Sequence, residues 1–142
     1  MIQFIAEQVT MPSIEISAMK AWIKWVAATY QFKCGDIAFV FCNDERILQV
    51  NNDYLQHDYY TDVITFDYST NTHIAGDVFI SLDTVRSNAI DAGIDFTPEL
   101  HRIIIHAILH LCGNDDKTPD LRAQMTEKEN SALAIFEENF KS

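Results

Sequence analysis

Positive charge and cysteine are both scarce in this chain. Of its 142 residues, 10 are lysine or arginine and 21 are aspartate or glutamate, so the formal net charge at pH 7 is -11. A protein that grips nucleic acid nonspecifically normally presents a basic face to the phosphates, and this charge argues against that class. The 3 cysteines form an odd set without any C-x-x-C spacing, which favours reduced thiols over a disulfide framework.

Long apolar runs and a secretory leader are also missing. No stretch stays apolar for the length that a bilayer requires, and the start, Met1 to Phe4, lacks the basic and long apolar parts of a secretory signal. We therefore expect a cytoplasmic protein. There are no internal repeats and no low-complexity linker, and a chain that is 48% hydrophobic can build one sizeable core. We expect a single domain over residues 1–142.

Hydrophobic periodicity predicts an α+β fold. Alternating patterns predict strands over residues 2–9, 36–42, 62–68 and 77–82, and residues 69–75 are a polar connection, either a hairpin or a looser loop. Helical spacing predicts helices over residues 17–30, 83–92, 97–112 and 118–140, and one more helix after residue 42. Asn43 and Asp44 can cap that helix, and its apolar face carries Ile47, Leu48 and Leu55. Thr97 and Thr118 are each followed by a proline, a combination typical of helix starts. The pattern predicts a mixed sheet of about four strands packed with about five helices.

The most informative stretch is residues 106–116, which reads HAILHLCGNDD. His106 and His110 are four residues apart and would lie one above the other on the same helix face. Gly113 permits the left-handed turn that commonly ends a helix, so the chain can reverse and bring Asp116 toward both imidazoles. Three protein ligands leave a coordination position for water, as in catalytic metal sites. The spacing therefore predicts a metal-dependent hydrolase.

Neighbouring residues leave the ligand set open. Asp115 could replace Asp116 if the turn differs by one residue, and Cys112 is a soft donor that could close a structural site. The two histidines could also be ordinary polar residues at the end of an apolar helix. The full pattern of two histidines, a glycine and a carboxylate favours the metal site.

Zinc peptidases with the motif H-E-x-x-H-x-x-G-x-x-H share this spacing. In those enzymes the residue after the first histidine is the glutamate that takes a proton from water. Here that position is Ala107, which cannot act as a base. This difference argues against peptide hydrolysis.

The same stretch resembles the hallmark of the YbeY endoribonucleases, also called rRNA maturation factors, which reads H-G-x-L-H-L-x-G-Y-D-H. It is matched directly at His106, Leu109, His110, Leu111 and Gly113. Ala107 replaces the first glycine of the motif, Asn114 its tyrosine and Asp116 its third histidine. An oxygen donor in the third position shifts a site toward harder ions.

Two further stretches are similar to the same family. Residues 51–54 and 61–66, NNDY and TDVITF, resemble N-x-x-Y-R followed by T-D-V-L-S-F, and residues 75–81, AGDVFIS, resemble G-D-I-x-I-S. Leu55 stands where the family has an arginine that is counted among its catalytic residues. The matches span residues 51–116 in the order of the family.

The resemblance implies a single-strand-specific endoribonuclease that acts in rRNA maturation, at the 3′ end of the small-subunit rRNA, and in ribosome quality control. It implies one zinc ion, or another divalent ion, on His106, His110 and Asp116. The expected partners are single-stranded rRNA and the ribosome or its associated proteins, with no membrane and no DNA. The acidic body suggests that such a partner, rather than long-range attraction, provides targeting.

The resemblance also suggests residues beside the metal. Asp62 and Asp77 are candidates for the catalytic base if their strands border the metal. Asp62 could equally cap the end of a strand, and Asp77 could instead accept a hydrogen bond from a ligand histidine. Thr61 and Thr65 are candidates for positioning the substrate. His57 could enter the cleft in place of the missing arginine, although a solvated loop histidine is favoured.

Other conspicuous residues have structural interpretations. Trp22 and Trp25 are expected to pack rather than to stack on RNA bases. His101 precedes His106 by five residues, which rotates it off the ligand face, so we interpret it as a surface or capping residue.

Two other classes of function stay open. One is a metal-dependent hydrolase of a different substrate. The other is a noncatalytic ribosome-assembly factor in which the ion only holds the last two helices to the sheet, an interpretation to which Leu55 gives weight.

Overall fold

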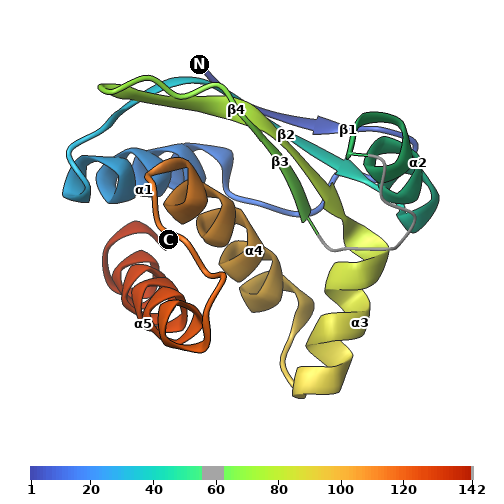
Figure 1. Ribbon diagram of the computed structural model, residues 1–142. Coiled ribbons are helices and arrows are strands. Elements are labelled where there is room, and N and C mark those ends of the chain that lie inside the picture. Colours follow the sequence, from blue (N-terminus) through green and yellow to red (C-terminus); the bar gives the residue numbers. More distant parts are fainter. Residues whose placement is uncertain (56–62, 142) are drawn as a thin grey trace.

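Four strands form one mixed sheet in the computed structural model, which describes residues 1–55 and 63–141 (Figure 1). The strand order is β1-β2-β4-β3. The parallel strands are β1 (Ile2–Ala6), β2 (Lys33–Cys42) and β4 (His73–Ser81), and β3 (Val63–Asp67) pairs antiparallel with β4 at the sheet edge. The predicted mixed four-stranded sheet is confirmed.

Five α-helices and a short π-helical turn accompany the sheet in the described ranges. They are α1 (Ile16–Thr29), α2 (Asp44–Leu55), α3 (Leu82–Ala92), α4 (Phe96–Leu111), α5 (Pro119–Ile135) and the turn η1 (Phe136–Phe140). This number of helices confirms the α+β prediction. None of the described helices has both the length and the apolar character that crossing a membrane requires.

Local capping explains where several helices begin and end. The Thr118 hydroxyl accepts a hydrogen bond from the Leu121 amide at 3.1 Å, and Pro119 occupies the first turn of α5, as its sequence predicts. The chain leaves α3 through Gly93, whose φ of 69° lies in the left-handed region. At α4 the structure differs from the prediction, because the helix begins at Phe96 with Asp95 in the N-cap position, before Thr97.

The structure corrects the predicted ends of three strands. β1 stops at Ala6, β2 begins at Lys33, and β4 begins at His73 rather than at residue 77. Residues 73–76 read HIAG, a short run in which alanine and glycine carry little strand propensity, although this backbone pairs with β2 from Lys33 onward. The polar connection is a hairpin, closed by the Tyr68 amide on the Ala75 carbonyl at 2.9 Å.

Helices cover the two faces of the sheet unequally. In Figure 1, α1 and α4 lie beneath the sheet and α5 lies beneath them. The main core fills this side, and a second small cluster of Ile47 and Val50 of α2 with Cys42 and Ile64 lies on the other. In α4 the run 103–105 is buried, as the apolar sequence suggests, so the helix is held against its neighbours along its length.

His101 is buried in this core, which corrects its interpretation as a surface or capping residue. It is 8% exposed, and its ring lies 4.8 Å from that of Phe136 and 6.1 Å from that of Trp22. Burial lowers the pKa of His101, and the nearby carboxylates of Glu137 and Glu15 oppose part of that effect. The side of α4 that carries His101 is covered by α1 and η1. Both come from parts of the sequence distant from α4, so the local sequence did not reveal this burial.

Gly76 lies where β4 and β3 leave no room for a side chain. A Cβ atom at this position would overlap the carbonyl oxygen of Phe66 and lie 3.3 Å from Leu111, which lines the site described below. We expect Gly76→Ala to lower the free energy of unfolding by about 1–3 kcal/mol, the usual cost of overpacking, in urea titrations. Gly35→Ala is the control, because its Cβ would come no closer than 3.2 Å to any neighbour. Equal losses in both variants would contradict this account.

Candidate metal centre

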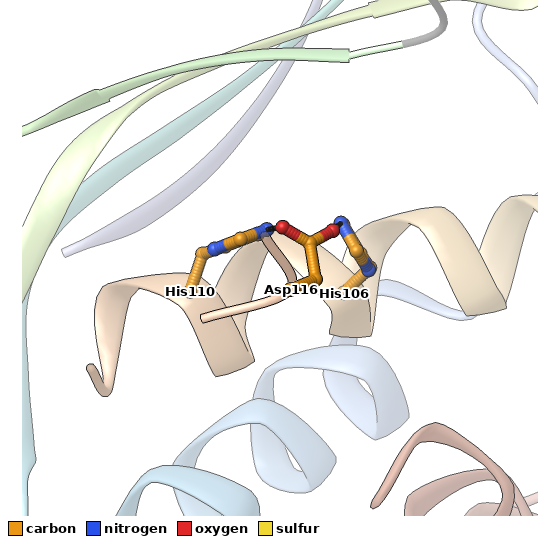
Figure 2. A group of neighbouring side chains, drawn as sticks. All are labelled: His106, His110 and Asp116. Atoms are coloured by element: carbon orange, nitrogen blue, oxygen red, sulfur yellow. Dashed lines mark ion pairs between the residues drawn. The ribbon is translucent and has the colours of Figure 1, made fainter. Parts of the chain in front are cut away.

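His106 and His110 lie one turn apart on the same face of α4, as their spacing predicts (Figure 2). Their ring centroids are 4.6 Å apart and the rings stand nearly perpendicular, at 80°. Both side chains are half-buried, with exposed fractions of 21% and 32%. The rigid helix therefore presents two imidazoles side by side, close to solvent.

The turn after α4 reverses the chain. Gly113 has a φ of 94°, the left-handed conformation that its position predicts, and its amide donates to the His110 carbonyl at 2.9 Å. The Asn114 side chain donates to the Leu109 carbonyl at 3.0 Å and accepts from Lys128 of α5 at 2.5 Å. These contacts hold the turn against both helices and determine where the next residues emerge.

Asp116 returns from this turn to face both histidines. One of its carboxylate oxygens lies 3.5 Å from His106 Nε2, and the other lies 3.5 Å from His110 Nε2. One potential ligand atom from each of the three residues lies within 4.8 Å of those of the other two. Two imidazole nitrogens and a carboxylate oxygen are donors that suit a divalent ion of the zinc type. The three residues therefore fit a metal ion.

The two alternative ligands do not join this group. Asp115 is exposed, and its carboxylate accepts a hydrogen bond from the Lys117 amide at 2.9 Å. Cys112 is buried, and burial, together with the neighbouring Cys34, raises the pKa of its thiol to about 12. Of the residues that the sequence left in competition, the structure brings only Asp116 to the two histidines.

Glu129 of α5 is a functional candidate that the sequence reasoning missed. Its Oε2 lies 2.5 Å from His106 Nδ1, and its Oε1 accepts from Arg102 at 2.8 Å. Burial alone would raise the pKa of Glu129, but the hydrogen bonds from His106 and Arg102 outweigh burial and lower it. A signal for this role was available in the sequence, because Glu129 is an acidic residue on the face of α5 that also carries the buried residues Met125 and Ala132.

A hollow of about 500 Å³ opens between β3 and the three candidate ligands. Its wall on the β3 side is made by alternate residues, which share one face of the strand. They are Val63, Thr65 and Asp67. The structure thus places Thr65 beside the histidines, and adds Asp67, which the sequence reasoning did not consider.

Asp77 lies on the opposite face of the sheet. Strand alternation places it between Gly76 and Val78, which face the helices, and it lines a separate hollow with Gln3 and Ala38. This placement corrects the expectation that Asp77 borders the metal or supports a ligand histidine. Glu129, not Asp77, accepts the hydrogen bond from His106.

Three candidates from the sequence lie outside the residues that the structure describes. They are Asp62, the other candidate base, Thr61, the other candidate for positioning substrate, and the loop histidine His57. The backbone of Leu55 ends α2, but its side chain also lies outside the description.

Comparison with known proteins gives one consistent result. Residues 3–137 match the family model described as endoribonuclease YbeY. The chain is 58% identical to the endoribonuclease YbeY of Parabacteroides distasonis over 96% of both chains. It is 54% identical to that of Bacteroides thetaiotaomicron, over 94% of this chain and 98% of the relative. The solution structure of TM1509 from Thermotoga maritima has a similar fold, with a TM-score of 0.65 at 21% identity, over 96% of this chain and 89% of that one.

Proposed function

The chain belongs to the endoribonuclease YbeY family and is an enzyme that hydrolyses phosphodiester bonds in RNA, and from this premise we propose that it cleaves single-stranded rRNA with a zinc ion held by His106, His110 and Asp116. The observation that carries the proposal is the convergence of two Nε2 atoms on one carboxylate, each at 3.5 Å. Three ligands on half-buried side chains leave room for water and substrate, unlike a closed structural site.

The residues around this group have separate proposed roles. When bound, zinc supplies an activated water and positive charge for the phosphodiester. The two histidines and the carboxylate hold the ion, and the turn at Gly113 keeps the carboxylate in place. Thr65 faces the group across the hollow and can donate its hydroxyl proton to a phosphate or ribose oxygen. We retain Asp62 as a candidate base and Thr61 as a candidate substrate contact, on the sequence resemblance alone.

The proposed substrate is the 3′ end of the small-subunit rRNA within an assembling ribosome in the cytoplasm, where the enzyme would also take part in ribosome quality control. A net charge of -11 repels free RNA at long range, so affinity must come from local contacts or from a partner. Ribosomal proteins or the assembled particle would bring the rRNA strand to the hollow. This division of roles reconciles an acidic protein with an RNA substrate.

Matched oligonucleotides test the proposal. We expect the zinc-loaded protein to cleave a single-stranded RNA with the sequence of the small-subunit 3′ end, and to leave the corresponding duplex and the single-stranded DNA of the same sequence intact. Chelation should abolish cleavage, and separate addition of zinc, manganese and magnesium should identify the metal that restores it. Equal cleavage of all three substrates would contradict the proposed specificity. Bound metal without any cleavage, on oligonucleotides or on ribosomes, would favour the noncatalytic assembly factor.

A further inference from the structure

A buried carboxylate faces the nitrogen of His106 that points away from the metal group. Glu129 Oε2 lies 2.5 Å from His106 Nδ1, while His106 Nε2 lies 3.5 Å from Asp116. We propose that Glu129 is a positioning residue, which fixes His106 in the tautomer whose unprotonated Nε2 can bind a metal. This inference rests on the proposed metal site and assigns a residue on α5 to it.

The chemistry of the contact determines the tautomer. A neutral imidazole carries one proton, on either Nδ1 or Nε2, and an ionised carboxylate can only accept a hydrogen bond. With Glu129 ionised, the contact at 2.5 Å places a proton on Nδ1, and in the neutral ring Nε2, which faces Asp116 at 3.5 Å, then carries the lone pair. A carboxylate at this position also fixes the plane of the ring and makes Nε2 a stronger donor to a metal.

Arg102 keeps the carboxylate charged and oriented. Glu129 is only 6% exposed, and a buried charge is tolerated when it is paired and hydrogen-bonded. Arg102 donates to Glu129 Oε1 at 2.8 Å and to Asn130 Oδ1 at 2.7 Å, so its guanidinium is anchored at two points. This arrangement uses one carboxylate oxygen and leaves the other for His106.

His110 provides a comparison within the same site. Among the described residues, none accepts a hydrogen bond from His110 Nδ1, and this side chain is the more exposed of the two histidines. The support from α5 therefore acts on one ligand and not on the other. Any perturbation at Glu129 should change His106 selectively.

Nitrogen NMR of the metal-free protein tests the inference without measuring activity. Long-range proton–nitrogen spectra of protein with labelled histidines, at a pH where both imidazoles are neutral, report which ring nitrogen carries the proton. We expect wild-type His106 to be protonated on Nδ1. In Glu129→Gln, Arg102 should retain the amide oxygen, which turns the amide nitrogen toward His106 and moves the ring proton to Nε2.

The same variant should bind metal more weakly. A proton on Nε2 must be displaced before zinc can bind, and loss of such a supporting group typically costs about 10- to 100-fold in affinity. Competition with a chromophoric zinc chelator measures this change. Glu127→Gln is the matched control, because Glu127 is exposed on the same helix. It should leave both the spectrum and the affinity unchanged.

Two outcomes would overturn the inference. One is wild-type His106 protonated on Nε2, a result that does not depend on any variant folding. The other is weaker zinc binding in Glu129→Gln with an unchanged His106 tautomer, which would give Glu129 a structural role only. RNA cleavage is scored separately, so a wild type that shows the expected tautomer but cleaves no RNA would contradict the proposed function alone.

Discussion

Replacing Asp116 with alanine is expected to reduce bound zinc from about one equivalent per chain to almost none, and to lower RNA cleavage by more than about 100-fold. The carboxylate contributes the only oxygen donor of the candidate group and its only negative charge. Without it, two half-exposed imidazoles remain, which bind a divalent ion weakly. Elemental analysis and cleavage of single-stranded RNA on the same samples measure both effects.

Asp115→Ala is the matched control for this substitution. Asp115 precedes Asp116 and has the same chemistry, but it is exposed and turned toward the Lys117 amide. We expect it to keep zinc and activity close to the wild-type values. Loss of zinc in Asp115→Ala with retention in Asp116→Ala would reverse the ligand assignment. Loss of zinc with full cleavage would contradict the metal mechanism.

Trp22→Ala is expected to have the largest effect on stability, a decrease of about 3–5 kcal/mol in the free energy of unfolding. The ring is fully buried, and its centroid lies 4.9 Å from that of Phe136. Its indole nitrogen donates to the Ala132 carbonyl of α5 at 2.8 Å. The substitution removes a side chain that packs α5, the helix that carries Glu129, against the rest of the core.

Trp25→Ala is the control, because it removes the same side chain from the same helix. Trp25 is 45% exposed, at the rim of a shallow groove between α1 and α5. Of the two tryptophans that the sequence predicts to pack, only Trp22 therefore has a buried ring. We expect a loss below about 1 kcal/mol for Trp25→Ala. Urea titrations of metal-free protein measure both variants, and similar losses would show that Trp22 does not have the proposed anchoring role.

The candidate ligands could be recognised in the sequence because they are local. His106 and His110 meet through helical periodicity alone, and Gly113 permits the turn that returns Asp116 within a few residues. Most helices could be predicted for the same reason, since apolar periodicity and capping residues act over one or two turns. The early part of β4 could not, because the run HIAG at residues 73–76 carries little strand propensity and pairs with a distant strand, β2.

The choice between neighbouring candidates needed the tertiary structure. Asp115 and Asp116 have the same side chain. Only the path of the turn, which Asn114 and Lys128 hold in place, directs Asp116 toward the histidines. Asp77 has a suitable side chain in a suitable strand, but the pleat places it on the other face of the sheet.

The α+β class, the position of the helix that carries the two histidines and the three candidate donors could be predicted from the sequence, because each depends on spacing within a short segment. The folded chain was needed to show that Glu129 contacts His106, that His101 is buried against Trp22 and Phe136, and that Thr65 faces the site. Those contacts join segments far apart in the chain. They depend on which helix covers which face of the sheet, and that is decided by the packing of the whole core.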